Sequence, residues 1–185
     1  MKKLVFAIIV ASAVGSASAQ TYVGAGVVAS SQNYTFAVTG PAISGAGDSA
    51  KASPKLLLGY DFNQTWGIET GFTYFRSADY HYSYLGQVFN GETKGHSMYI
   101  AGKITLPIAG RFSFVGKLGI SDNERYLQDA MFKADESRKG VYTSIGVQYL
   151  LNEKVSVSLA YEQYGKRGGA GLKANAFSLS AKYAF

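Results

Sequence analysis

The chain ends with Phe177-Ser178-Leu179-Ser180-Ala181-Lys182-Tyr183-Ala184-Phe185, a stretch in which apolar and polar residues alternate. Successive side chains of a β-strand point to opposite faces. One face of this stretch would therefore carry large apolar and aromatic groups, while the other would carry serines and a lysine. Such a two-faced strand is typical of a transmembrane β-barrel, in which lipid-facing and lumen-facing residues alternate.

Seven further segments repeat this alternation with a period of two residues. Each is roughly ten residues long, the length that a tilted strand needs to cross a membrane. They lie at about 22–36, 53–62, 66–76, 96–106, 111–121, 140–151 and 155–164. Together with the closing stretch, they predict eight strands.

The predicted connections alternate between short and long. Short turns are expected at 63–65, 107–110 and 152–154, and long polar segments at 40–52, 77–94, 122–139 and 165–173. This order is typical of a barrel with both termini and the short turns in the periplasm and the long loops outside. The predicted fold is all-β: an eight-stranded antiparallel up-and-down transmembrane β-barrel with four long extracellular loops.

The first 19 residues have the layout of a signal peptide. Lys2 and Lys3 are followed by an apolar run from 4 to 14 and by small residues at 17–19. The apolar run is too short for a helix to cross about 30 Å of hydrocarbon. We therefore expect cleavage before Gln20, a barrel domain at 20–185 and export to the outer membrane of a Gram-negative bacterium. Loss of the two lysines lowers the formal charge from +6 to +4.

Composition agrees with one exported domain. The 185 residues include 22 Gly, 14 Tyr and 11 Phe but no Cys, so neither a disulfide nor thiol chemistry is available. No stretch marks a linker, and no nucleic-acid-binding motif is present. We expect a protein without cofactor, without a metal site and without nucleic-acid partners.

Alternation alone leaves a second barrel open, because a soluble lipocalin-like carrier would turn its larger apolar residues inward around a ligand. The polar face favours the membrane barrel, since its charged residues recur near mid-strand beside Gly, Ala and Ser, which suit a narrow interior. Unpaired buried charges would be costly, so we expect an interior charge network. Its predicted members are Lys55, Asp61, Glu69, Lys103, Lys117, Glu162 and Lys182.

The lumen of an eight-stranded barrel is just wide enough for side chains to fill it. A plugged interior is therefore favoured over the alternative of a small-solute pore. Aromatic residues near the predicted strand ends suit the girdles of a membrane barrel; they are Tyr60, Phe62, Trp66, Phe112, Tyr149, Tyr161, Tyr183 and Phe185.

Two stretches resemble a known family. Phe112-Ser113-Phe114-Val115-Gly116-Lys117-Leu118-Gly119 looks like the fifth strand of OmpA-like transmembrane domains, and residues 146–165 resemble their strand six to seven hairpin. The resemblance covers the second half well and the first half by pattern. No peptidoglycan-binding domain follows Phe185, so the chain looks like the small OmpX-like or opacity-like surface proteins, and a cell-wall tether is not expected. The ending on Tyr183 and Phe185 resembles the signal read by the barrel-assembly machinery.

The long loops are the predicted functional surface, because loops on a rigid scaffold can vary without disturbing it. Amphipathic rings at Tyr80, Tyr82, Tyr84 and Phe89 suit binding to a host or surface ligand, or else pack on one another above the rim. Basic residues expected at the outer rim suit contact with lipopolysaccharide phosphates. They are Arg76, Lys94, Arg138, Lys139, Lys166, Arg167 and Lys173.

Catalysis is the competing class, because some eight-stranded barrels modify lipid A. Acyl transfer needs a nucleophile with a positioned base. His81 lies in a predicted loop with only Asp79 nearby, and His96 and Ser97 would point to opposite faces of one strand. We therefore predict a monomeric, non-enzymatic integral outer-membrane protein with a role in envelope integrity or in adhesion through its loops.

Overall fold

The computed structural model describes residues 19–32, 52–84, 87–128, 133–165 and 174–185. They form eight strands: β1 (Gln20–Gln32), β2 (Ala52–Asp61), β3 (Trp66–Tyr84), β4 (Gln87–Ala109), β5 (Phe112–Gln128), β6 (Lys133–Leu150), β7 (Val155–Tyr164) and β8 (Ala174–Ala184). Across these ranges, no helix has the length and apolar character needed to cross a membrane.

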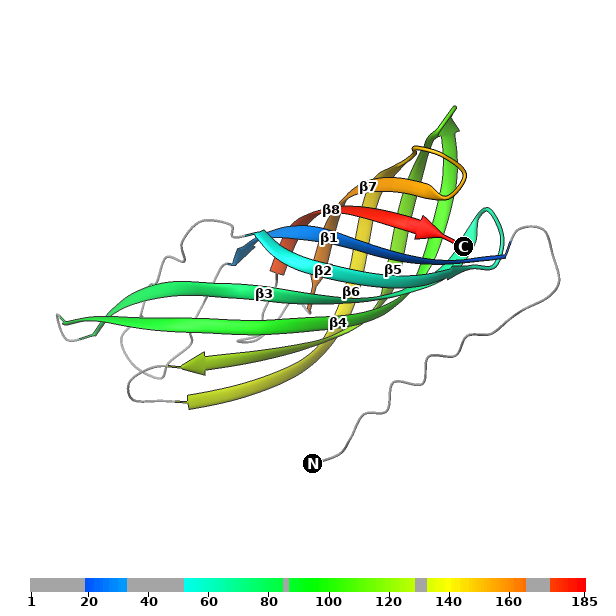
Figure 1. Ribbon diagram of the computed structural model, residues 1–185. Helices are drawn as coiled ribbons and strands as arrows, with labels where there is room; N and C mark the ends of the chain where they lie inside the picture. The colour runs from blue at the N-terminus through cyan, green and yellow to red at the C-terminus, as the bar shows by residue number, and fades with distance from the viewer. Residues whose placement is uncertain (1–18, 33–51, 85–86, 129–132, 166–173) are drawn as a thin grey trace.

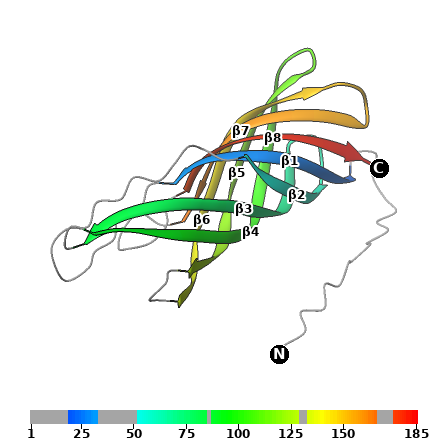
Figure 2. The same ribbon diagram turned by 60° about the vertical axis from the view of Figure 1, so that its left-hand side comes forward.

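The eight strands close into one barrel in which every strand pairs antiparallel with its neighbours in sequence (Figure 1). Closure is made by β1 and β8, whose register runs from Tyr22 opposite Ala184 to Gln32 opposite Ala174. The two views of the barrel show the strands inclined around a common axis (Figure 2). The predicted up-and-down barrel is confirmed, with the closing stretch 177–185 lying within and just beyond β8.

Four strands run further than the sequence predicts. The β3–β4 ladder continues to Tyr84 opposite Gln87, and the β5–β6 ladder continues to Gln128 opposite Lys133. The segments 77–94 and 122–139, predicted as loops, are therefore mainly paired strands, which extend well past the first residue of β2 in Figure 1. Residues 122–128 and 133–139 carry no apolar face, and Tyr80, Tyr82 and Tyr84 alternate with polar residues instead of aliphatic ones. Backbone pairing does not require an apolar face, and an antiparallel ladder can continue where both of its faces meet water. The predicted loops at 40–52 and 165–173 lie almost wholly outside the described residues.

Two of the short turns are stabilised in the same way, by an asparagine side chain. The side-chain oxygen of Asn63 accepts hydrogen bonds from the backbone N–H groups of Thr65 and Trp66, at 2.9 and 2.8 Å. Asn152 does the same with Lys154 and Val155, at 2.9 and 2.8 Å. These bonds replace a backbone turn, the usual reason for Asn at such positions.

The third turn is tighter than the predicted span 107–110. Strand β4 continues to Ala109 after a register irregularity that follows Pro107, a place where a strand tolerates proline. The chain reverses at Gly110, whose φ of 52° lies in the left-handed region that glycine enters without a Cβ penalty.

Burial settles the orientation of the two faces. On β2, outward Leu56 is 61% exposed, whereas inward Lys55 is only 2% exposed. The same division holds around the described barrel, where the exposed large side chains are apolar and many buried ones are Lys, Glu, Ser and Thr. This is the reverse of the arrangement in a soluble lipocalin-like carrier, so that alternative is wrong.

Glycines make room for the inward tyrosines. A Cβ built on Gly59 would lie 2.1 Å from the ring of Tyr22, and one on Gly71 would lie 2.4 Å from the ring of Tyr99. Both glycines face the lumen beside strands that carry the large ring, so small and large residues alternate around the interior. This packing fixes the positions of two phenol groups near the centre of the barrel.

Candidate functional site

The lumen is the part of the described structure in which charged side chains converge. Lys55 on β2 and Glu162 on β7 form an ion pair of 2.5 Å, and both side chains are only 1% exposed. Strands β2 and β7 are not neighbours in the barrel, so the pair crosses the lumen. Ser178 donates a further hydrogen bond of 2.8 Å to Glu162.

Glu69 on β3 is the centre of the network. Its fully buried carboxylate lies 2.5 Å from the ammonium of Lys117 and 3.3 Å from that of Lys182. The phenols of Tyr22 and Tyr99 donate hydrogen bonds of 2.8 and 2.5 Å to the same carboxylate. One acidic side chain thus connects β1, β3, β4, β5 and β8.

A third carboxylate lies closer to the short-turn end. The ammonium of Lys103 is 2.6 Å from one oxygen of Asp61 and 2.9 Å from the other. It also lies 4.3 Å from the centre of the Tyr22 ring, a cation–π distance. The structure thus places all seven charged residues singled out in the sequence inside the lumen, in three groups centred on Asp61, Glu69 and Glu162.

Tyrosines pack among these charged groups in the lumen. The rings of Tyr99 and Tyr142 stack with centroids 3.9 Å apart, and Tyr142 lies 5.2 Å from Tyr164. Tyr164 donates a short hydrogen bond to Glu162, and the ammonium of Lys55 lies 4.9 Å from the Tyr99 ring. The phenol oxygen of Tyr142 is buried without a hydrogen-bond partner among the described residues.

These tyrosines are the functional residues that sequence reasoning missed. Tyr99 and Tyr142 fall on the polar faces of their strands, together with Lys103 and Ser144. Their place on the polar face could have identified them, because a tyrosine on the lumen face of a narrow barrel must fill space with its ring and find a hydrogen-bond partner for its phenol. Their partners depend on register, which the sequence alone does not give.

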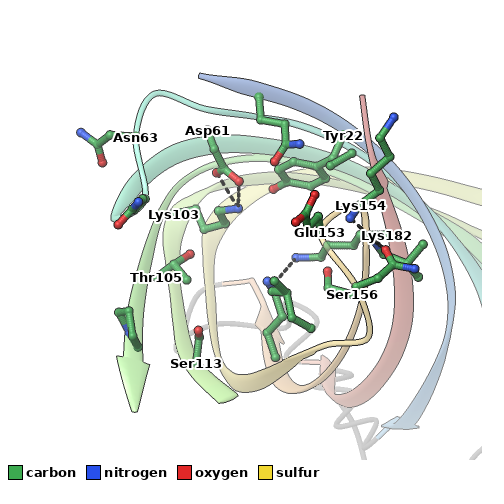
Figure 3. Close-up of a pocket in the computed structure, with 18 residues that line it drawn as sticks. Tyr22, Asp61, Asn63, Lys103, Thr105, Ser113, Glu153, Lys154, Ser156 and Lys182 are labelled. Atoms are coloured by element: carbon green, nitrogen blue, oxygen red, sulfur yellow. Dashed lines mark hydrogen bonds and ion pairs between the residues drawn. The ribbon is translucent and has the colours of Figure 1, made fainter. Parts of the chain in front are cut away.

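A cavity of about 390 Å³ opens at the short-turn end of the barrel. Figure 3 shows Lys103 and Lys182 reaching into it from opposite sides, with the ring of Tyr22 between and above them. The cavity is lined by charged, amide and hydroxyl side chains, with Pro107, Leu150 and Val155 as the larger apolar residues. It can therefore hold water or a small polar molecule.

The structure describes the side chains of only some of the basic residues predicted for the outer rim. Arg76 and Lys139 are exposed on β3 and β6. Lys94 and Arg138 lie on strands, but their side chains are outside the description, and 166–173, with three more of the predicted cations, lies wholly outside it. The backbone of the predicted aromatic surface lies in the β3–β4 hairpin, where Tyr82 pairs with Phe89 in register, Tyr80 with Gly91 and Tyr84 with Gln87.

The outer wall carries the predicted aromatic groups at the short-turn end. Tyr183 and Phe185 are 44% and 68% exposed, and their rings meet edge to face at 5.3 Å. Phe62, Trp66, Phe112 and Tyr149 are also exposed there, and Tyr60 is partly buried. Tyr161 is the exception, because it pairs with Phe177 further along β7, away from the short turns. The structure thus presents a ring of aromatics at the height of the short turns.

His96 and Ser97, the adjacent pair considered for acyl transfer, point to opposite faces of β4. His96 lies on the outer wall, 3.3 Å from Glu124, whereas Ser97 is buried in the lumen and donates a 2.6 Å hydrogen bond to Asn123. The side chain of His81 is outside the description. Within the described ranges, no three His, Cys, Asp or Glu residues come together in a way that could hold a metal ion.

Comparisons with known proteins agree with this geometry. The sequence profile of the outer membrane protein β-barrel domain matches residues 4–185. No curated protein matches the sequence significantly.

Among solved structures, OprG from Pseudomonas aeruginosa has a TM-score of 0.63 at 15% identity, over 91% of this chain and 96% of that chain. Ail of Yersinia pestis, in complex with the heparin analogue sucrose octasulfate, has a TM-score of 0.57 at 16% identity, over 91% and 99%. Outer membrane protein W of E. coli has a TM-score of 0.53 at 13% identity, over 91% and 98%. At such low identity, the likeness concerns the fold.

Proposed function

The chain belongs to the outer membrane protein β-barrel domain family, and we propose that it acts in the cell outer membrane as a closed scaffold that supports the envelope and presents its long hairpins outside the cell. The observation that carries this proposal is the filled lumen. Glu69, Glu162 and their lysine and tyrosine partners connect strands on opposite sides of the barrel across its lumen.

Energetics support a plug. Breaking a buried ion pair leaves an uncompensated charge and lowers the stability of the fold by about 3–5 kcal/mol. Opening a path through this lumen would require separating Lys55 from Glu162 and unstacking Tyr99 from Tyr142. A small-solute pore is the alternative, and the cavity at the short-turn end is the observation that favours it, because it brings solvent to Tyr22.

Conductance separates the two functions. The refolded protein would be inserted into planar lipid bilayers, with the triple variant Lys55→Ala, Tyr142→Ala, Glu162→Ala as a positive control, because it removes both the ion pair and the stacked ring. The scaffold proposal predicts no stable unitary conductance from the wild type and measurable steps from the triple variant. Stable steps from the wild type would establish a pore.

The proposed surface role assigns binding to the β3–β4 hairpin, which is extended in the same way as the β5–β6 hairpin. Both extend beyond β2 and β7, so they would project from the membrane on the side opposite the short turns. The β3–β4 hairpin bears Tyr80, Tyr82, Tyr84 and Phe89, groups suited to binding proteins or glycans. The Ail structure with a heparin analogue is a precedent for a polyanion bound by a barrel of this fold.

A register-preserving deletion tests the surface role. Asp79 pairs with Glu92, so replacing residues 80–91 by a two-residue Asn-Gly turn shortens the β3–β4 hairpin without shifting the ladder. The matched control shortens β5–β6 beyond Arg125 and Glu136, which also pair. Cells producing the first variant should lose attachment to matrix- or heparin-coated surfaces, and the control should retain it; attachment unaffected by either deletion removes the adhesion role.

The basic rim is proposed to bind lipopolysaccharide phosphates. Arg76 and Lys139 are the two exposed members that the structure describes, and Lys94, Arg138, Lys166, Arg167 and Lys173 are proposed with them. Each basic group near an anionic surface contributes about 1 kcal/mol. In lipopolysaccharide-containing nanodiscs, Arg76→Ala with Lys139→Ala should lower the stability gained over phospholipid alone, whereas Lys154→Ala in a short turn should not.

We further propose that residues 1–19 are removed on export and that Tyr183 and Phe185 are read by the barrel-assembly machinery. Mass spectrometry of the membrane-extracted protein gives the first residue, expected to be Gln20. We propose no enzymatic activity, because the described His96 and Ser97 lie on opposite faces of β4. An altered lipid A acyl pattern in cells that overproduce the protein would contradict this view.

A further inference from the structure

The charges inside the described lumen do not balance. Four lysines, Lys55, Lys103, Lys117 and Lys182, meet three carboxylates, those of Asp61, Glu69 and Glu162. Lys55, Lys103 and Lys117 each lie within 2.6 Å of a carboxylate oxygen. Lys182 shares Glu69 with Lys117 at a longer distance, 3.3 Å, so it is the least closely paired of the four lysines.

Lys182 is held in place but incompletely satisfied. Its side chain is 4% exposed, and its ammonium has three hydrogens to donate. Besides Glu69, it contacts the side-chain oxygen of Gln148 at 3.5 Å and lies 5.2 Å from the centre of the Tyr22 ring. Both polar contacts are long for charge-assisted hydrogen bonds, which are usually about 2.7–2.9 Å. A negatively charged hydrogen-bond acceptor in the cavity would give this ammonium the close partner that it lacks.

The cavity at the short-turn end brings a second cation to the same place. Lys103 lies on the other side of Tyr22, with its ammonium 4.3 Å from the ring centre (Figure 3). Neutral donors line the same space, from Thr105, Ser113 and Ser156. The ionisable side chains of the lining include three basic residues, Lys103, Lys154 and Lys182, and two acidic ones, Asp61 and Glu153.

We propose that this cavity binds a small oxyanion, such as inorganic phosphate or a short carboxylate, between Lys182 and Lys103. Hydroxyl and amide groups of the lining would donate further hydrogen bonds to its oxygens. The ligand would enter from the periplasmic side and would stop at Tyr22 and the Glu69 group. The site is separate from the extracellular hairpins, so it can exist whether or not these bind a partner.

Removal of Lys182 is a clean test, because it leaves three lysines for three carboxylates. Lys182→Met should therefore fold, and heat-modifiable gel migration would check that it does. The matched control is Arg111→Gln, which removes a cation from the same end of the barrel but outside the cavity lining. The refolded proteins would be titrated with inorganic phosphate and, separately, with acetate while nuclear magnetic resonance spectra are recorded. Sodium chloride at equal ionic strength is the reference.

The proposal predicts saturable shifts of the Tyr22, Lys103 and Lys182 signals in the wild type and in Arg111→Gln, with phosphate and acetate arms reporting which oxyanion is preferred. Lys182→Met should weaken binding about tenfold or more, which corresponds to about 1.4 kcal/mol. Absence of saturable shifts in the wild type would overturn the proposal, and so would equal weakening by Arg111→Gln, because general attraction to the barrel end would then explain the shifts.

Discussion

The inner and outer walls of this barrel are made by the same strands but obey different rules. On β5, Leu118 is 66% exposed on the outside, whereas its neighbour Lys117 is 8% exposed inside and bonded to Glu69. Outward residues need only be apolar, because lipid adapts to their shape. Inward residues must match a partner on a distant strand in both charge and distance. The apolar outer residues therefore suit the protein to a membrane, and the matched inner residues determine how the strands of this barrel are held together across its lumen.

The inner wall also connects strands that are not paired. Lys55 and Glu162 connect β2 with β7, and Glu69 connects β3 with β5 and β8. Backbone hydrogen bonds join only neighbouring strands. We infer that the interior groups restrict changes in the cross-section of the barrel, a restraint that the outer wall does not supply.

The largest expected effect is on the inner wall. Glu69→Gln leaves the ammonium of Lys117 buried without its carboxylate, so the free energy of unfolding should fall by about 3–5 kcal/mol. Urea titration of the protein folded into lipid vesicles measures it. Glu153→Gln, in an exposed turn, is the control and should change little. A similar small change for both variants would mean that the interior network contributes no specific stability.

The next effect belongs to the outer wall. Leu118→Lys puts a charge on the lipid face near the middle of β5, and should cost about 2–4 kcal/mol. Leu151→Lys, in a short turn, provides the same change near the interface, where the cost falls to about 0–1 kcal/mol. The same titration in vesicles measures both. Equal costs at the two positions would show that position 118 does not lie at membrane depth.

The smallest effect compares two phenols of the inner wall. Tyr142→Phe removes a buried hydroxyl that has no partner in the described structure, so stability should rise by about 1 kcal/mol. Tyr164→Phe removes a donor to the Glu162 carboxylate and should cost about 1.5–3 kcal/mol. Thermal or urea unfolding of both variants gives the signs. A loss for Tyr142→Phe would indicate that its hydroxyl has a bound partner such as water.

Alternation along the chain predicted a barrel with two different faces, because side chains in a strand repeat every two residues. The charged residues beside Gly, Ala and Ser were needed to predict which face lies inside. It also placed Lys55, Glu69 and Glu162 on one face. It could not give their partners, since Lys55 and Glu162 are separated by 107 positions and meet only after closure of the barrel. The stacking of Tyr99 on Tyr142 was missed for the same reason.

The strand ends above the membrane were predicted less well. Residues 133–139 lack an apolar face, so nothing in their alternation marks them as a strand. Tyr80, Tyr82 and Tyr84 do alternate with polar residues, a strand-like pattern that was interpreted as an aromatic loop. Their pairing follows from the ladder below, because each hairpin continues a register already set within the barrel. The membrane boundary, rather than the end of the strand, is what the apolar pattern records.

The claim that the apolar face of each strand contacts lipid and the charged face lines the lumen is tested most directly by measuring the contact of single residues with lipid. The protein, in nanodiscs that contain lipid spin-labelled along its acyl chains, would be examined by nuclear magnetic resonance relaxation along β5. The account predicts strong relaxation of Leu118 and Ile120 and weak relaxation of Lys117 and Ser121, a period of two residues. Equal relaxation of both sets, or strong relaxation of Lys117 and Ser121 alone, would contradict it.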